Sequence, residues 1–182
     1  MGTWLQIVAD IEASENEAAE LARKVSTWFV SKGIIAATPA PRLSTSDDIE
    51  YLPGPKAESV LDDPGEGSLR PHNTVSITTG RTVFHTYQDS FSLICEKCGA
   101  HNEDGAVWAE AVGEWYDDRG PGILACEKCG FAQPITRWRF DPDWGFGFLG
   151  FTFRDWPSLD RAFIEDISTV LGHKIVYIYT KL

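Results

Sequence analysis

The sequence predicts an α+β domain in which a mainly antiparallel sheet carries two helices on one face and a four-cysteine module is inserted between its strands. Two amphipathic segments with clear start and stop signals predict the helices. Short apolar and β-branched runs around them predict the strands. All four cysteines stand in two copies of the phrase CEKCG, which predicts the inserted module.

The two predicted helices lie near opposite ends of the chain. The first occupies residues 14–33, where apolar side chains recur every three or four positions between a Ser-x-x-Glu capping box and Gly33. The second occupies residues 157–172, opened by Pro157 and closed by Gly172. Each follows a predicted strand and an acidic turn, so this order of elements indicates a structural repeat.

The predicted strands account for most of the remaining apolar residues. They lie at residues 3–9, 74–87 (two short strands around Thr79-Gly80), 91–94, 134–140, 150–153 and 174–180. The phrase GFGFLG at 145–150 matches a dinucleotide-binding pattern literally, but no helix opens behind it. Its alternating phenylalanines predict sheet instead, with the glycines leaving room for neighbouring rings.

The chain is predicted to form one domain over residues 1–182, with the cysteine module at 91–140 as an insertion. A long loop at 38–73 holds six of the ten prolines. Composition is compatible with a mobile surface loop. The alternative is a partner-contacting loop anchored by Tyr51 and Leu52, with a helical turn near KAESVL, and this choice stays open.

The charge balance restricts the partners. Sixteen basic and 27 acidic residues give a net charge of −11. Phosphate backbones and anionic membranes require clustered Lys and Arg, so we expect neither nucleic acid nor membrane as a partner. A basic protein surface is favoured instead. The sequence shows no apolar run of the roughly 18 residues needed to span a membrane and begins with acids, so a cytoplasmic protein is expected.

The cysteine spacing is C-x2-C-x27-C-x2-C, and a glycine follows each pair at once. A C-x-x-C turn can bring two thiolates to one tetrahedral ion, and the glycine tolerates positive φ as the chain leaves the turn. Two disulfides, two redox sites or four unconnected thiols are the alternatives, and a reducing compartment disfavours the first. The pattern therefore predicts a structural metal site made of Cys95, Cys98, Cys126 and Cys129.

This repeated knuckle resembles those of the zinc-ribbon and rubredoxin-like group, over about residues 91–140 and only in the four ligands and two glycines. The resemblance implies two hairpins that hold Zn or Fe between them. Rubredoxins usually carry proline within a knuckle, whereas both pairs here enclose Glu-Lys, which favours zinc over iron. Many zinc ribbons bind nucleic acid, but three basic and eight acidic residues between Cys95 and Cys129 argue against that here.

Signals for catalysis are absent from the sequence. No nucleophile elbow, H-E-x-x-H or Walker loop occurs, and each of the four histidines stands outside a known motif. His101, three residues after Cys98, is an alternative metal ligand. An enzyme whose site is scattered in sequence remains an alternative, for which His85 or His173 beside a carboxylate would be the signal.

The segment between the cysteine pairs alternates large rings with acids. A partner-binding surface is predicted at an apparent loop tip formed by Glu114, Trp115, Tyr116, Asp117 and Asp118. The competing interpretation is that Trp108 and Trp115 cover the metal site while the acids face water.

Together these features favour a non-enzymatic, zinc-stapled acidic protein that binds a basic protein partner. By analogy of charge and size, its most concrete form is an inhibitor similar to bacterial immunity or antitoxin proteins. An accessory subunit of a larger assembly, with or without nucleic acid, is the further alternative. A basic stripe formed by Arg137, Arg139, Arg154 and Arg161 would revive nucleic-acid binding.

Overall fold

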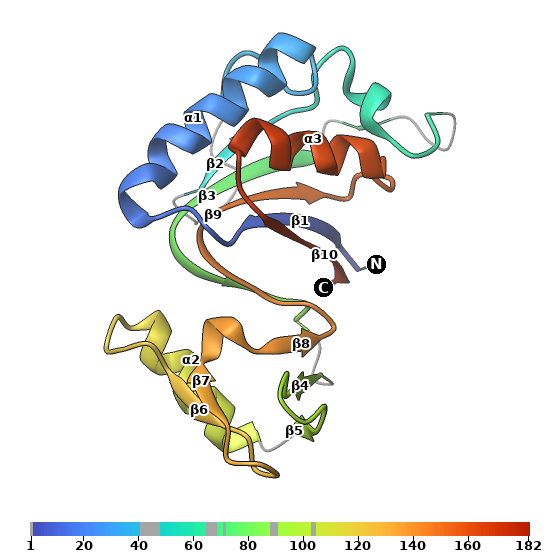
Figure 1. The fold of residues 1–182 in the computed structure, drawn as a ribbon. Coiled ribbons are helices and arrows are strands. Elements are labelled where there is room, and N and C mark those ends of the chain that lie inside the picture. The colour runs from blue at the N-terminus through green and yellow to red at the C-terminus, as the bar shows by residue number, and fades with distance from the viewer. Residues whose placement is uncertain (1, 41–47, 65–68, 71, 88–90, 103–104) are drawn as a thin grey trace.

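The molecule has two lobes, one above the other in Figure 1. The computed structural model describes residues 2–40, 48–64, 69–70, 72–87, 91–102 and 105–182. The first lobe, called the sheet lobe, contains both ends of the chain; the second, called the cysteine lobe, is formed by residues 91–102 and 105–144. Within the described residues there are three α-helices and ten strands, mainly antiparallel, as an α+β fold requires.

The sheet lobe is built on five antiparallel strands in the order β10-β1-β9-β3-β2. Their bounds are β1 Trp4–Asp10, β2 Ile49–Tyr51, β3 Thr74–Phe84, β9 Gly145–Arg154 and β10 Ile175–Lys181. Helix α1 (Glu15–Lys32) connects β1 toward β3, and α3 (Arg161–Leu171) connects β9 to β10. Strands β1 and β3 are parallel and lie on either side of β9, and β9 and β10 are parallel and lie on either side of β1. This is the split β-α-β connectivity of ferredoxin-like domains. The expected repeat of strand, helix and strand is therefore present in the topology.

Helices α1 and α3 cover the same face of the sheet, as predicted (Figure 1). Phe29 of α1 and Phe163 of α3 meet Phe151 and Phe153 of β9 in one buried cluster. The capping box at Ser14 and the left-handed Gly33 delimit α1. Helix α3 begins later than predicted, because the carboxylate of Asp160, and not Pro157, caps it by accepting the backbone N–H of Ala162.

The opposite face of the sheet carries a smaller apolar cluster around Phe84, formed with Leu5, Ile7, Ala9 and Ile178. The predicted use of glycine in β9 is confirmed here, since a methyl group at Gly150 would overlap the ring of Phe84. Residues 74–84 form one continuous strand and not the two short strands predicted. A bulge between Thr79 and Thr82, with Gly80 at φ 107°, bends this strand without reversing it.

The proline-rich segment 38–73 is partly ordered against the sheet lobe. It supplies the edge strand β2 and a short 3-10 helix, η1 (Ala57–Val60), where a helical turn was predicted. Tyr51 packs against the main core. Residues 41–47, 65–68 and 71 of this segment lie outside the described residues.

The cysteine lobe interrupts the chain between β3 and β9 (Figure 1). A three-stranded sheet contains β5 (His101–Asn102), β4 (Ser92–Ile94) and β8 (Arg139–Asp141) in that order. A hairpin contains β6 (Ile123–Ala125) and β7 (Ala132–Pro134), and a 3-10 helix, η2 (Ile135–Arg137), precedes β8. A third helix, α2 (Gly105–Tyr116), occupies the segment for which the sequence analysis expected a loop. No described helix has the length and apolarity that a membrane-spanning helix requires.

Candidate metal centre

The two cysteine phrases fold into matching turns. Gly99 N–H donates to the Cys95 carbonyl and Gly130 N–H to the Cys126 carbonyl, each at 2.8 Å. Both glycines have a φ of 68°, the left-handed region that favours glycine over side-chain-bearing residues. Cys95 and Cys126 also donate their own N–H groups to Ala100 and Phe131, which closes each turn. The repeated sequence therefore folds into a repeated local structure.

The turns bring all four sulfurs to one place. The thiols of Cys95, Cys98, Cys126 and Cys129 lie within 4.8 Å of one another. The closest approaches are between the turns, with Cys95 Sγ to Cys129 Sγ and Cys98 Sγ to Cys126 Sγ both at 3.7 Å. Four ligands about 2.3 Å from a tetrahedral ion would lie about 3.8 Å apart. The spacing matches a tetrahedral metal site and is too long for disulfide bonds.

The polar surroundings of the cluster favour a thiolate at Cys126. Burial of this thiol raises its pKa, but backbone N–H groups of Cys129 and Lys128 and the neighbouring thiols outweigh that effect and lower the pKa to about 6. Thiolates are the form that binds a metal. A backbone hydrogen bond to Ala100 lowers the pKa of Cys98, but burial and the neighbouring thiols raise it to about 11. The convergence of the four sulfurs, and not the pKa of one thiol, shows that the cluster could hold a metal ion.

A buried amide connects the two turns. Asn102 Oδ1 accepts the backbone N–H of Glu127 at 3.0 Å, while its Nδ2 lies near the carbonyls of Leu93 and Ala100. This side chain ties the second cysteine turn to the strands that carry the first. The sequence analysis did not identify Asn102, because nothing local to the phrase HN indicates a contact with residue 127.

The structure separates the histidines from this cluster. His101 is not among the converging ligand atoms, and its Nδ1 lies 3.0 Å from Ser92 Oγ. His173 Nδ1 lies 2.9 Å from Oδ2 of the fully buried Asp10, whose Oδ1 accepts the N–H groups of Glu12 and Ala13. Within the described chain, no hydroxyl or thiol hydrogen-bonds to the His173 imidazole. The pair links the turn after β1 to the turn after α3, which gives it a structural role.

The five residues of the predicted partner-binding surface lie at the end of α2 and in the turn that follows. Tyr116, Asp117 and Asp118 are exposed, Glu114 is half-buried, and Trp115 is only 8% exposed. Trp115 packs with the buried thiols of Cys95 and Cys126 in the core of the cysteine lobe. Trp115 therefore supports this surface from below and offers little of its ring to a partner.

The four arginines named as a possible basic stripe do not form one. Arg137 and Arg139 belong to the cysteine lobe, Arg154 ends β9, and Arg161 lies on α3, where it pairs with Glu165. This distribution gives no support to nucleic-acid binding.

The fold and the site define an α+β protein with an inserted lobe whose four cysteines could hold a metal ion. No known protein family, curated protein or solved structure matches the chain.

Proposed function

We propose that this chain is a zinc-stapled, non-enzymatic binding protein that contacts a basic protein partner through the turn formed by Tyr116, Asp117 and Asp118. The observation that carries the proposal is an exposed ring beside two exposed acids, in a turn that packs on the buried Trp115 and is contacted by Arg81. Tyr116 is 55% exposed, and both carboxylates face solvent. Tyrosine is enriched at interface hot spots, and surrounding charges steer an oppositely charged partner.

The turn is held in one conformation by Arg81 of the sheet lobe. The Arg81 guanidinium donates to the carbonyl of Trp115 at 3.1 Å and to Asp118 Oδ1 at 2.5 Å. It also lies over the rings of Trp115 and Phe148, 5.1 and 4.9 Å from their centroids. A surface that is already ordered loses less conformational entropy when a partner binds.

Zinc suits the cluster in this proposal because four thiolates satisfy its tetrahedral preference and its binding needs no redox chemistry. With Cys95, Cys98, Cys126 and Cys129 as ligands, every coordination position is taken by protein. Such an ion contributes folding free energy and offers no open position for water or substrate. It would fix the lobe that carries the turn.

The physiological role that we propose is that of an inhibitor, similar to immunity or antitoxin proteins, which binds over the functional surface of a basic protein. The net charge of −11 on 182 residues supports this role, since opposite charges accelerate association. The similarity to immunity and antitoxin proteins is one of net charge and chain length.

The proposal is tested by reversing the charge of the turn. A protein captured from the source cell by the wild-type chain is purified, and its association is measured over a range of salt concentrations. The double variant Asp117→Lys, Asp118→Lys should associate at least about tenfold more slowly at low salt and show a weaker salt dependence.

The matched control is Glu165→Lys, Asp166→Lys on α3, which makes the same charge change on the other lobe. These two residues are also exposed. If this control slows association as much as the turn variant, net charge alone explains the result and the assignment of the turn is wrong. Wild-type kinetics in the turn variant would contradict it equally.

A further inference from the structure

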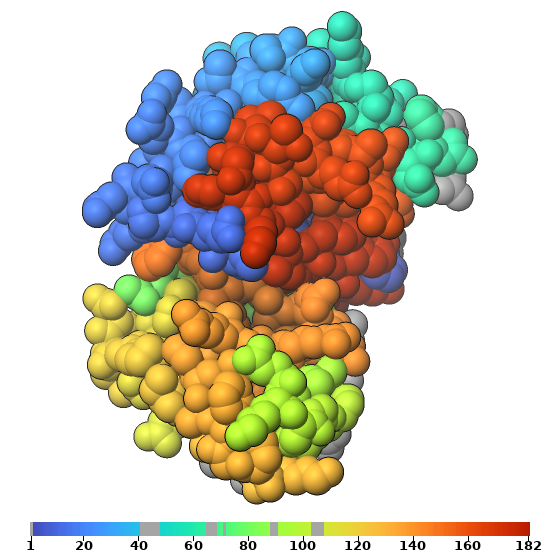
Figure 2. All heavy atoms as spheres, in the orientation of Figure 1, coloured from blue at the N-terminus to red at the C-terminus, as the bar shows by residue number. Residues whose placement is uncertain are grey.

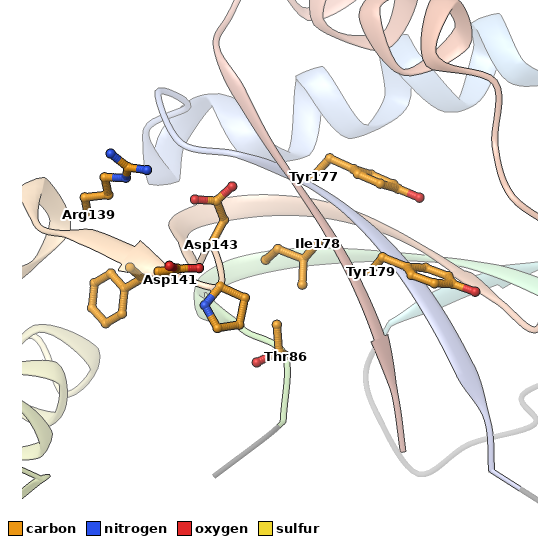
Figure 3. A pocket seen from close by; sticks show the side chains of 9 residues that line it. Thr86, Arg139, Asp141, Asp143, Tyr177, Ile178 and Tyr179 are labelled. Carbon is orange, nitrogen blue, oxygen red and sulfur yellow. The ribbon is translucent and has the colours of Figure 1, made fainter. Parts of the chain in front are cut away.

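A cleft lies between the two lobes, on the side where β8 approaches β10. Its larger part has a volume of about 700 Å³ and is lined by Ile11, Glu12 and Lys174 of the sheet lobe and by residues 136–140 of the cysteine lobe. A second hollow of about 330 Å³ continues from it, because Arg139, Phe140 and Asp143 line both. Figure 2 shows the molecule narrowing between its lobes, and Figure 3 shows Arg139, Asp143 and Ile178 around the second hollow. Neither the cysteines nor the Tyr116 turn lines this cleft.

The cleft contains arginines without a counter-charge. Arg137 and Arg139 are exposed, and neither has a carboxylate within ion-pair distance among the described residues. Arg81, Arg119 and Arg161 each have such a partner. Lys174 adds a third positive charge, 4.0 Å from Glu12. In a chain with 27 acidic and 16 basic residues, the lining of the larger part holds three positive charges and two carboxylates, Glu12 and Asp143.

Aromatic side chains form the wall beside the arginines. Trp138, Phe140, Trp144 and Phe146 all line the larger part, and the rings of Phe140 and Trp144 stack at 4.8 Å with an interplanar angle of 12°. The indole N–H groups of Trp138 and Trp144 are buried and have no acceptor within the described part of the chain. Apolar rings with a few converging charged groups, in a cleft between lobes, are the usual composition of a small-molecule site.

The mixture of charges restricts the ligand. Glu12 and Asp143 line the larger part and Asp141 lines the second hollow, so the anion must be compact enough to reach the arginines without approaching the carboxylates. A long polyanion would extend onto a surface whose net charge repels it. A bare cation would meet the two guanidinium groups.

We propose that this cleft binds a small organic anion with a planar ring. Its carboxylate or phosphate pairs with Arg137 and Arg139, and its ring lies against Trp144, the one half-buried ring of the aromatic wall. Guanidinium groups bind carboxylate and phosphate through the same pair of parallel hydrogen bonds, so the two anions share this recognition chemistry. The site is separate from the proposed partner-binding turn, and either can fail without the other.

Isothermal titration calorimetry with the full chain tests the proposal. Adenosine 5′-monophosphate and indole-3-acetate supply a ring with a phosphate or a carboxylate, and the tighter of the two identifies the anion. Adenosine and inorganic phosphate supply the ring or the anion alone, and both should bind at least about tenfold more weakly. Failure of both ring-bearing anions to bind below about 1 mM overturns the proposal, as does tighter binding of a tetraglutamate peptide.

Two variants locate the binding. Arg139→Gln should raise the Kd of the better probe at least about tenfold, and adding Arg137→Gln should raise it further. Both side chains are exposed and unpaired among the described residues, so the folded structure should persist, which circular dichroism verifies. Arg161→Gln on α3 removes the same charge outside the cleft and should leave the Kd unchanged. An unchanged Kd in the double variant would show that the anion binds elsewhere.

Discussion

Gly150 is the residue that allows the ring of Phe84 to pack directly on the face of the sheet away from the helices. It lies in β9 opposite Ala9 of β1, and the ring of Phe84 covers it on the face away from the helices. The residue has no side chain to hold this ring off the sheet. Its neighbours Leu149 and Phe151 point to the other face and are completely buried there.

The variant Gly150→Ala should therefore be destabilised, by about 1–3 kcal/mol, because the new methyl group must displace a buried ring. Urea unfolding monitored by circular dichroism measures this change. The same substitution at Gly113, within α2, is the control: its methyl group would meet only Arg119 Nη2 at 3.7 Å. Helix propensity should make that variant more stable by roughly 0.5–1 kcal/mol. Equal stability of the two variants would contradict this account of Gly150.

At this scale the sequence predicted the thiol pairs of the cluster because the geometry of each pair is local. Each C-x-x-C-G phrase contains its own turn, so the spacing identifies the two thiols of each turn, while the repeat of the phrase indicates that the two turns share one site. Asn102 could not be predicted in this way, because its contact with Glu127 spans 25 positions. The exposure of Trp115 depends on the packing of α2, which the same local pattern does not specify.

Several elements meet at one buried amide. Gln6 of β1 donates through Nε2 to the carbonyls of Trp156 and Pro157, which lie between β9 and α3. Its Oε1 accepts the Leu159 N–H and the Tyr177 hydroxyl of β10, each at 2.8 Å. The Gln6 side chain therefore fixes the connection between β9 and α3.

Replacing this amide should loosen that connection. Gln6→Leu leaves buried donors and acceptors unpaired and should cost about 3 kcal/mol or more in the free energy of unfolding. Tyr177→Phe removes only one of the hydrogen bonds and should cost about 1 kcal/mol. Chemical unfolding of both variants compares the two losses. A Gln6→Leu loss no larger than that of Tyr177→Phe would show that the amide is dispensable.

The helices of the sheet lobe were predictable because caps and apolar periodicity both mark them in the sequence. Helix α2 was missed although Trp108, Ala111, Val112 and Trp115 have helical spacing. The acids between these rings suggested an exposed loop, yet they only occupy the solvent side of an amphipathic helix. The bulge in β3 was missed because a glycine within a strand rich in β-branched residues indicates a turn as readily as a bend.

At the scale of the whole molecule, the cysteine lobe is an insertion that contributes no strand to the five-stranded sheet. The chain passes between the lobes after β3 and before β9, and the contacts of Arg81 with Trp115 and Asp118 and of Phe146 with Trp115 brace this junction. The sheet lobe has its own large core around Phe29 and Phe151. The core of the cysteine lobe includes Cys95 and Cys126.

Metal removal should consequently affect the lobes unequally. A strong chelator should abolish hydrogen-exchange protection in β4 to β8 while strands β1 and β9 keep theirs, because the metal is expected to stabilise only the lobe whose core contains its ligands. Hydrogen exchange read by mass spectrometry resolves the two regions. Simultaneous loss of protection in both lobes would show that they unfold as one cooperative unit.

The topology of the sheet could be predicted only as a class. The sequence indicated mainly antiparallel strands with two helices on one face, and the structure has that arrangement. The strand order requires pairings such as β1 with β10, which join opposite ends of the chain. The cleft between the lobes likewise depends on their relative placement, which no local pattern encodes.

Elemental analysis of the freshly purified chain, combined with titration of its thiols, tests the central claim most directly. We expect one zinc ion per chain and four thiols that react with a thiol reagent only after a chelator is added. The variant Cys98→Ser should lose the ion and expose the remaining thiols. A metal-free wild-type chain with four freely reactive thiols would contradict the account.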